Sequence, residues 1–250
     1  MAAINIRIGN RRFAPGLWPS LITVLLFPVL VALGCWQLDR AGQKRALYEQ
    51  SVRHGTEAVL NLNSAGAVKE NKTEMMWRHI LATGQFDPGT QILLDNQFSN
   101  AGEPGYLVLT PFRLTGENSW FLVNRGWIPM GADRNVLPSI NTPAEEITIQ
   151  AVVTDVPVTG LFLGDKAIET LPDGAYRAQR IKIEEIAPLL KHDLLPYVLR
   201  LESDSPHGFV REWIMPGSGE EKHLGYAFQW FALAATLLTI YFFVNLKKLS

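Results

Sequence analysis

The stretch that decides the fold is His223-Leu-Gly-Tyr-Ala-Phe-Gln-Trp-Phe231, which continues without a charged side chain to Leu246. The segment 224–246 consists mostly of Leu, Ala, Phe, Ile, Val and Thr. At about 1.5 Å per residue, a helix of this length can cross a bilayer. The stretch therefore predicts a membrane-spanning helix over 224–246, and its first turn combines histidine, tyrosine, glutamine and tryptophan.

A second apolar segment lies near the other end of the chain. No charged residue occurs from Phe13 to Leu38, and residues 17–38 predict a first spanning helix. Basic residues precede this segment, as they precede a cleavable signal peptide. However, the apolar run is longer than a signal core and no Ala-x-Ala site follows it, so we interpret the segment as retained.

The charges outside the two spans predict the orientation of the chain. Basic residues occur in both tails, 1–16 and 247–250 (Arg7, Arg11, Arg12, Lys247 and Lys248). Under the positive-inside rule both tails are cytoplasmic, and residues 39–223 form a periplasmic domain. We therefore expect a two-pass protein of the bacterial inner membrane, in contact with the lipid bilayer at both spans.

The domain between the spans shows the patterns of an α+β fold. From Trp77 onward, hydrophobic residues alternate with a period of two, and turn residues separate the runs. The predicted strands are 78–86, 91–96, 106–114, 120–127, 147–155 and 197–201, and residues 183–191 predict a helix. The fold class is thus a membrane protein with two transmembrane helices flanking one antiparallel-β-rich domain with at least one helix.

Composition excludes several classes of function. The net charge of −1, without a face loaded with Lys and Arg, argues against a nucleic-acid partner. The single cysteine, Cys35, lies in the first span, so the domain has no disulfide, no C-x-x-C motif and no cysteine-based zinc or copper site. Met75 and Met76 have no third soft ligand nearby, which favours packing over copper binding. No nucleophile–base pair, metal triad or phosphate loop is evident, so we expect that the protein is not an enzyme.

Three motifs carry a resemblance to a known family. They are Gly34-Cys35-Trp36-Gln37-x-x-Arg40, the hairpin Gly105–Phe112 with Val123-Asn124-Arg125-Gly126-Trp127, and His223-Leu-x-Tyr226-x-x-Gln229-Trp230. Together they resemble the Surfeit locus protein 1 family, the assembly factors of haem–copper cytochrome c oxidase. The resemblance covers both spans and the domain in order, whereas Cys35 is not part of the family signature.

The resemblance implies a chaperone function rather than catalysis. It implies that the protein binds haem a, transiently, and delivers it to, or stabilises it in, the main subunit of cytochrome c oxidase. The implied partners are that subunit and haem a synthase. The family's candidate haem ligand, a histidine at the outer start of the second span, corresponds to His223.

The residues around His223 have the chemistry of a haem site. Haem iron is commonly held by a neutral imidazole. Tyr226 and Trp230 lie on the same helical face as His223, together with Ala227 and Ala234, and the first span can present Trp36 opposite. Cations for the propionates are available from Arg40, Lys44, Arg45 and Lys222. We therefore name His223, Tyr226, Trp230, Trp36 and Arg40 as cofactor-binding candidates, with His223 on the iron.

Other interpretations of these residues stay open. A histidine beside tyrosine and tryptophan is also typical of an interfacial aromatic belt, in which Trp36 anchors the helix and Arg40 snorkels. His54 is either a second axial ligand or a solvated linker residue. An interaction scaffold that steadies an oxidase subunit without binding haem is the alternative function. A two-pass sensor is disfavoured because the cytoplasmic tails are short.

The motif Asn124-Arg125-Gly126 also has two interpretations. At the end of a strand, these residues are typical of turn chemistry, with Gly126 allowing a β-bulge. Alternatively, they form a docking surface for an oxidase subunit, with Arg125 as the anchor. We favour the structural interpretation.

Overall fold

The computed structural model describes residues 6–69, 71–131, 138–159, 167–171 and 174–248. The chain forms two compact units. A helical unit combines Met1–Glu49 with Met215–Ser250, and a β-rich unit comprises Gln50–Ile214.

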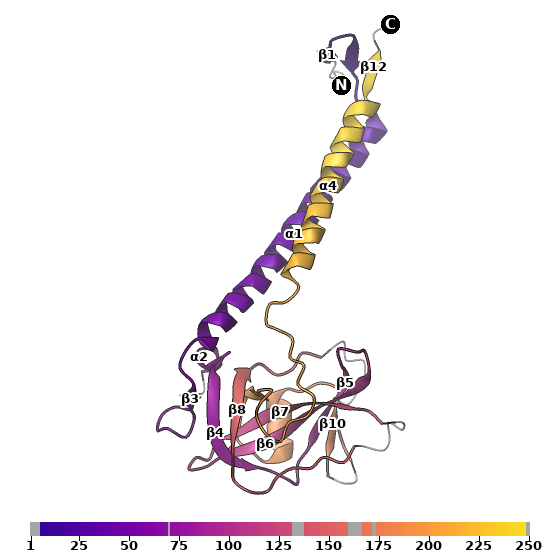
Figure 1. Cartoon of the computed structure of the whole chain (residues 1–250). Helices are drawn as coiled ribbons and strands as arrows, with labels where there is room; N and C mark the ends of the chain where they lie inside the picture. Colours follow the sequence, from indigo (N-terminus) through magenta and orange to yellow (C-terminus); the bar gives the residue numbers. More distant parts are fainter. Residues whose placement is uncertain (1–5, 70, 132–137, 160–166, 172–173, 249–250) are drawn as a thin grey trace. The chain divides into compact units, whose positions relative to one another are not determined.

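Two long helices lie side by side in the helical unit (Figure 1). They are α1 (Leu17–Gly55) and α4 (Glu220–Val244), and both are long and apolar enough to cross a membrane. Helix α1 continues unbroken through Pro28 and well beyond Leu38, as the helix-forming residues 41–50 predict. Its 39 residues correspond to about 58 Å, roughly twice the thickness of a bilayer's hydrocarbon core.

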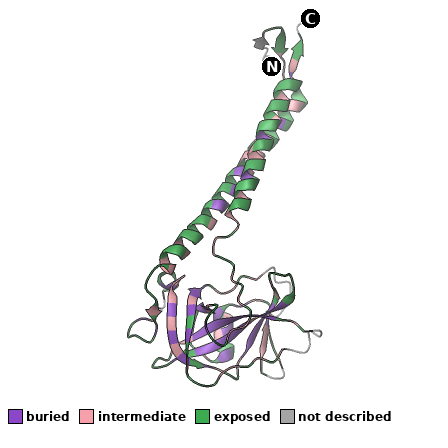
Figure 2. Ribbon diagram, in the orientation of Figure 1, coloured by how far each residue is buried: buried purple, intermediate pink, exposed green. Residues whose placement is uncertain are grey.

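The two helices pack along a seam of small and polar side chains. The buried positions on α1 are Thr23, Gly34, Gln37 and Ala41, and those on α4 are Ala227 and Ala234. Small residues leave room on one helix for the side chains of the other. At Gly34 a Cβ atom would lie only 2.7 Å from the ring of Phe231, so this ring packs directly against the glycine backbone. Most other residues of both helices are exposed or only partly buried (Figure 2).

Short strands from the segments 6–13 and 246–248 meet at one end of this helix pair. Strands β1 (Ile6–Ile8), β2 (Arg11–Phe13) and β12 (Leu246–Lys248) form a small antiparallel sheet. Beside it, the buried side chain of Asn245 accepts a hydrogen bond from the Gly16 N–H at 2.7 Å. The same side chain donates to the Tyr241 carbonyl at 2.7 Å, so one amide ties the end of α4 to the chain entering α1.

The β-rich unit contains one mixed sheet and two short helices. The strands are β3 (Leu60–Asn61), β4 (His79–Phe86), β5 (Ile92–Phe98), β6 (Pro104–Leu114), β7 (Trp120–Pro129), β8 (Ile147–Thr154), β9 (Ile168–Thr170), β10 (Tyr176–Ala178) and β11 (Leu194–Leu201), and the helices are α2 (Lys72–Met75) and α3 (Ile183–Leu190). The six predicted strands and the predicted helix are confirmed. The unpredicted elements β3, β9, β10 and α2 have two to four residues each, too few to produce a periodic pattern.

Five strands of this sheet close into a barrel. The ring runs β4–β8–β11–β7–β6 and returns to β4 through an additional β4–β6 pairing. A ring with an odd number of strands cannot alternate in direction all the way round, so one neighbouring pair has to be parallel. That pair is β7 and β11, and the pairs β5–β10 and β3–β4 are parallel as well. The other pairings of this sheet are antiparallel, so the predicted antiparallel-β-rich domain is confirmed, with parallel pairing at these three places.

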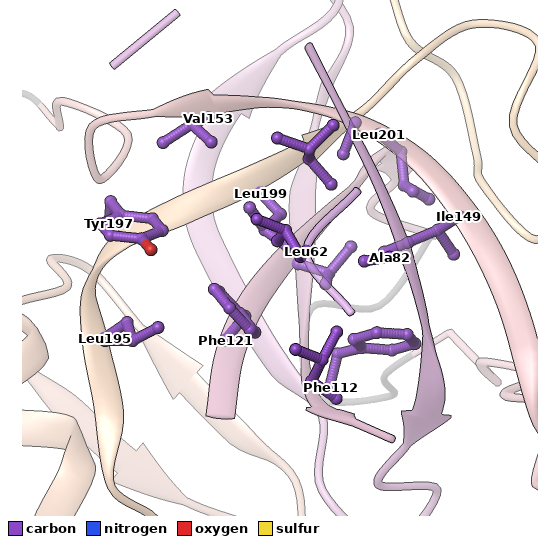
Figure 3. Packing of buried hydrophobic residues seen from close by; sticks show 14 of the residues in the cluster. Leu62, Ala82, Phe112, Phe121, Ile149, Val153, Leu195, Tyr197, Leu199 and Leu201 are labelled. Carbon is purple, nitrogen blue, oxygen red and sulfur yellow. The ribbon is translucent and has the colours of Figure 1, made fainter. Parts of the chain in front are cut away.

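The inward-facing side chains of the barrel form the main core. Figure 3 shows Phe112, Phe121 and Tyr197 packed among aliphatic side chains from the surrounding strands. The Tyr197 hydroxyl donates to the Lys69 carbonyl at 3.1 Å, and burial raises its pKa. Met75 is part of this core and is 1% exposed, which supports packing over copper binding for that residue.

Closure of the barrel depends on Gly84. Strands β4 and β6 meet over Gly84, Gln85 and Phe86 only. A Cβ atom at Gly84 would collide with the backbone carbonyl of Arg113 on β6. A backbone atom cannot move aside as a flexible side chain does, so a larger residue would separate the two strands.

We predict that Gly84→Ala destabilises the protein by about 1–3 kcal/mol, the usual cost of overpacking. The measurement is the thermal unfolding midpoint of the detergent-solubilised full-length chain. Gly89→Ala is the matched control, because its nearest neighbouring atom would be a side-chain oxygen at 3.5 Å. Equal midpoints for the two variants would contradict the assignment of closure to Gly84.

Candidate functional site

His223 lies in the first turn of α4 and is half-buried. Its Nδ1 atom lies 2.7 Å from Oε1 of Gln37 on α1. Because an amide oxygen only accepts hydrogen bonds, Nδ1 donates and carries the ring proton in this arrangement. The other nitrogen, Nε2, then keeps its lone pair, which is the form of imidazole that binds metals.

Gln37 is buried in the seam between the two helices. It lies three residues after Gly34 and four before Ala41, and its side chain is 8% exposed. From the sequence, Gln37 stands out only as part of a motif, and its pairing with His223 was not predicted. The signal in the sequence is a polar residue at a seam position between two small residues.

The aromatic candidates surround this pair less closely than predicted. Gln37, and not Trp36, faces His223, because consecutive helical residues point about 100° apart. Trp36 is 48% exposed and Tyr226 is 53% exposed, whereas Trp230 is half-buried. The seam buries Ala227 and Ala234, so any apolar wall beside His223 comes from the rings of Tyr226 and Trp230.

Cations lie on α1 within two turns of Gln37. The Arg40 guanidinium lies 5.7 Å from the centre of the Trp36 ring and donates to Gln43 Oε1 at 2.8 Å. Arg45 pairs with Glu49 at 3.5 Å, which leaves Arg40 better placed than Arg45 to meet an added anion. The chain entering α4 packs on the same part of α1, because Gly217 touches Lys44 and Tyr48.

These residues fit a haem group in chemistry. An imidazole with a free Nε2 suits an iron ligand, exposed aromatic rings suit the faces of a porphyrin, and a guanidinium suits a propionate. No group of three or more His, Cys, Asp and Glu side chains gathers as a metal site among the residues that the structure describes. The candidate site therefore rests on one histidine of this chain.

The other four histidines lie in the β-rich unit, and the side chains of His54, His79 and His192 have partners there. His54 contacts the Met76 carbonyl at 2.6 Å, and His79 pairs with Glu202. His192 stacks on Trp120 with ring centres 3.8 Å apart and lies 3.3 Å from Asp87. His207 has a left-handed backbone with φ 63°. A second axial role for His54 stays an untested alternative.

The motif Asn124-Arg125-Gly126 forms a β-bulge in strand β7. Val108 pairs with Gly126 and Leu109 pairs with Asn124, so Arg125 is the extra residue. The Asn124 side chain accepts from the Gly126 N–H at 3.1 Å, and Gly126 has φ 113°. This geometry is the turn chemistry that the structural interpretation predicted.

Arg125 is almost completely enclosed, with 1% of its surface exposed. Its guanidinium donates to the His207 carbonyl at 2.9 Å, to Thr142 Oγ1 at 2.7 Å and to the Asn141 carbonyl at 2.8 Å. The rings of Phe86 and Phe209 lie 5.0 and 4.9 Å from it. Burial lowers the pKa of Arg125 to about 10, so the side chain stays charged at neutral pH. Arg125 thus fastens two loops to the barrel, and a docking role would have to act through those loops.

We predict that Arg125→Met destabilises the chain by at least about 3 kcal/mol, since three hydrogen bonds are lost and each hydrogen bond to a charged group contributes about 1.5–3 kcal/mol. Methionine keeps most of the volume, so the loss reports on the hydrogen bonds. The measurement is thermal unfolding of the full-length protein in detergent. Arg113→Met, at an exposed arginine on the adjacent strand β6, is the control and is expected to change the midpoint little. Unchanged stability in Arg125→Met would leave docking as the better interpretation.

Comparison with known proteins gives a consistent result over most of the chain. The family model described as "SURF1 family" matches residues 24–235. A SURF1-like protein of Rickettsia felis is 25% identical over 232 residues, which are 89% of this chain and 94% of the relative. A SURF1-like protein of Rickettsia bellii is 27% identical over 231 residues, 88% of each chain. Surfeit locus protein 1 of Arabidopsis thaliana is 28% identical over 120 residues, 45% of this chain and 34% of the relative. The resemblance noted from the three motifs is confirmed.

Proposed function

Because the chain belongs to the SURF1 family, whose members are known in general as assembly factors of cytochrome c oxidase, we propose that it binds haem a and delivers it to, or stabilises it in, the main subunit of a haem–copper cytochrome c oxidase. The observation that carries this proposal is the half-buried His223, whose Nδ1 bonds to Gln37 and whose Nε2 is free to bind iron. In this proposal haem a synthase supplies the cofactor and the oxidase subunit receives it.

The proposal includes insertion of α1 and α4 in the bacterial inner membrane, with both termini in the cytoplasm and the β-rich unit in the periplasm. Large apolar side chains exposed on both helices support the insertion of the two helices in a membrane, since water does not tolerate so many together. They include Leu21, Leu25, Val29, Phe228, Leu233, Ile240 and Phe243. The backbone groups of a helix are satisfied internally, as the hydrocarbon region requires.

Each residue of the site has a distinct part in this proposal. His223 binds the iron through Nε2, and Gln37 accepts a hydrogen bond from Nδ1, the other nitrogen of the ring. Tyr226, Trp230 and Trp36 offer aromatic surface to the porphyrin, and Arg40 binds a propionate. Bound haem a supplies an iron that accepts the imidazole lone pair. The transfer of an intact cofactor exchanges ligands and breaks no covalent bond, so the chain needs no catalytic nucleophile.

We predict that His223→Ala abolishes binding of haem a. The full-length protein is co-expressed with the enzymes of haem a synthesis and purified in detergent, and the visible absorption spectrum is recorded. His207→Asn is the matched control, because asparagine tolerates the left-handed backbone at that position. We expect a haem a spectrum in the wild type and the control, and none in His223→Ala.

Oxidase assembly in the same strains separates the two candidate functions. A spectrum that is unchanged in His223→Ala would refute the iron-ligand assignment. If no variant binds haem a while His223→Ala still supports assembly, the interaction scaffold is the better description.

A further inference from the structure

The hydrogen bond between Gln37 and His223 selects one of two forms of the ring. A neutral histidine carries its proton on either Nδ1 or Nε2, and the hydrogen bond at one nitrogen decides which form is present. Here Gln37 Oε1 accepts from Nδ1 at 2.7 Å. The form with a bare Nε2 is therefore favoured before any cofactor arrives.

The seam restricts the conformations that Gln37 can adopt. Its side chain is 8% exposed and extends from α1 between Gly34 and Ala41. Gly34, one turn before Gln37 on α1, contacts the Phe231 ring of α4, so side chains of α4 enclose this part of the seam. A buried amide held in this way presents its oxygen in a fixed direction, which an exposed glutamine does not.

We propose that Gln37 is the positioning residue of the His223 site, which holds Nδ1–H and so presents Nε2 as the only nitrogen available to iron. This inference rests on the proposed haem function for its purpose, but the tautomer itself is measurable without haem. When a residue that hydrogen-bonds the second ring nitrogen of a metal-binding histidine is removed, the metal affinity typically falls about 10- to 100-fold.

The first test is nitrogen NMR on the haem-free, full-length protein in detergent, with ¹⁵N in the histidine rings. The spectra are recorded at a pH at which the rings are neutral, and His223→Ala identifies the signals of His223. We expect Nδ1–H for His223 in the wild type and a shift toward Nε2–H in Gln37→Leu. Gln37→Glu keeps an accepting oxygen at the same position and should restore Nδ1–H.

Gln43→Leu is the matched control for the first test. Gln43 lies on the exposed side of the same helix and bonds to Asp39 and Arg40, not to His223. Its removal should leave the His223 signals unchanged. Nε2–H in the wild type, or an unchanged Nδ1–H population in Gln37→Leu, would overturn the proposal.

The second test measures occupancy by haem a in the same variants after co-expression with the synthesis enzymes. We expect a strong loss in Gln37→Leu and recovery in Gln37→Glu. A changed tautomer with unchanged occupancy would overturn the positioning role. A changed tautomer in a series in which even the wild type takes up no haem a would refute the haem function while retaining Gln37 as the residue that selects the tautomer.

Discussion

The hydrogen bond between Gln37 and His223 joins packing and chemistry in one constraint. A polar side chain buried without a partner costs several kcal/mol in an apolar environment. Gln37 is buried in the helix seam, and the His223 ring supplies its partner at 2.7 Å. The two side chains meet because the helices pack side by side, with the small residues Gly34, Ala41 and Ala227 buried between them. The register of the seam therefore sets both the stability of the helix pair and the orientation of the candidate ligand.

A second constraint acts within the β-rich unit, on residues 202–214, which follow the last barrel strand β11. The bulge at Arg125 turns its guanidinium toward the carbonyls of Asn141 and His207. Three residues after His207, Val210 exchanges two backbone hydrogen bonds with Trp127. A charged side chain with neutral acceptors and two aromatic rings as neighbours is costly to bury, and three well-directed hydrogen bonds offset that cost. The segment is thus held to the barrel by directional contacts, although Arg125 belongs to a strand far from it in sequence.

Local patterns in the sequence predicted the main helices and strands. They did not predict the contacts between residues that are distant in the sequence. Hydropathy alone predicted both long helices, and alternation predicted six strands. The parallel pairing of β7 with β11 follows from ring closure, which no local pattern encodes. Helical faces suggested Trp36 opposite His223, but the seam register brings Gln37 there instead. Burial of Arg125 was equally hidden, because a charged residue at a strand end is ordinarily exposed.

The solvent exposure of the candidate site is consistent with the proposed transfer of haem a. A protein that passes haem a onward has to hold it and then release it intact. A fully buried pocket would need large rearrangement for each transfer, whereas a ligand at the end of a helix needs little. His223 is only half-buried, and the rings of Trp36 and Tyr226 are about half exposed. An imidazole whose ring is already held by the hydrogen bond to Gln37 would lose little conformational freedom on binding, so adequate affinity and an accessible site are compatible in this arrangement.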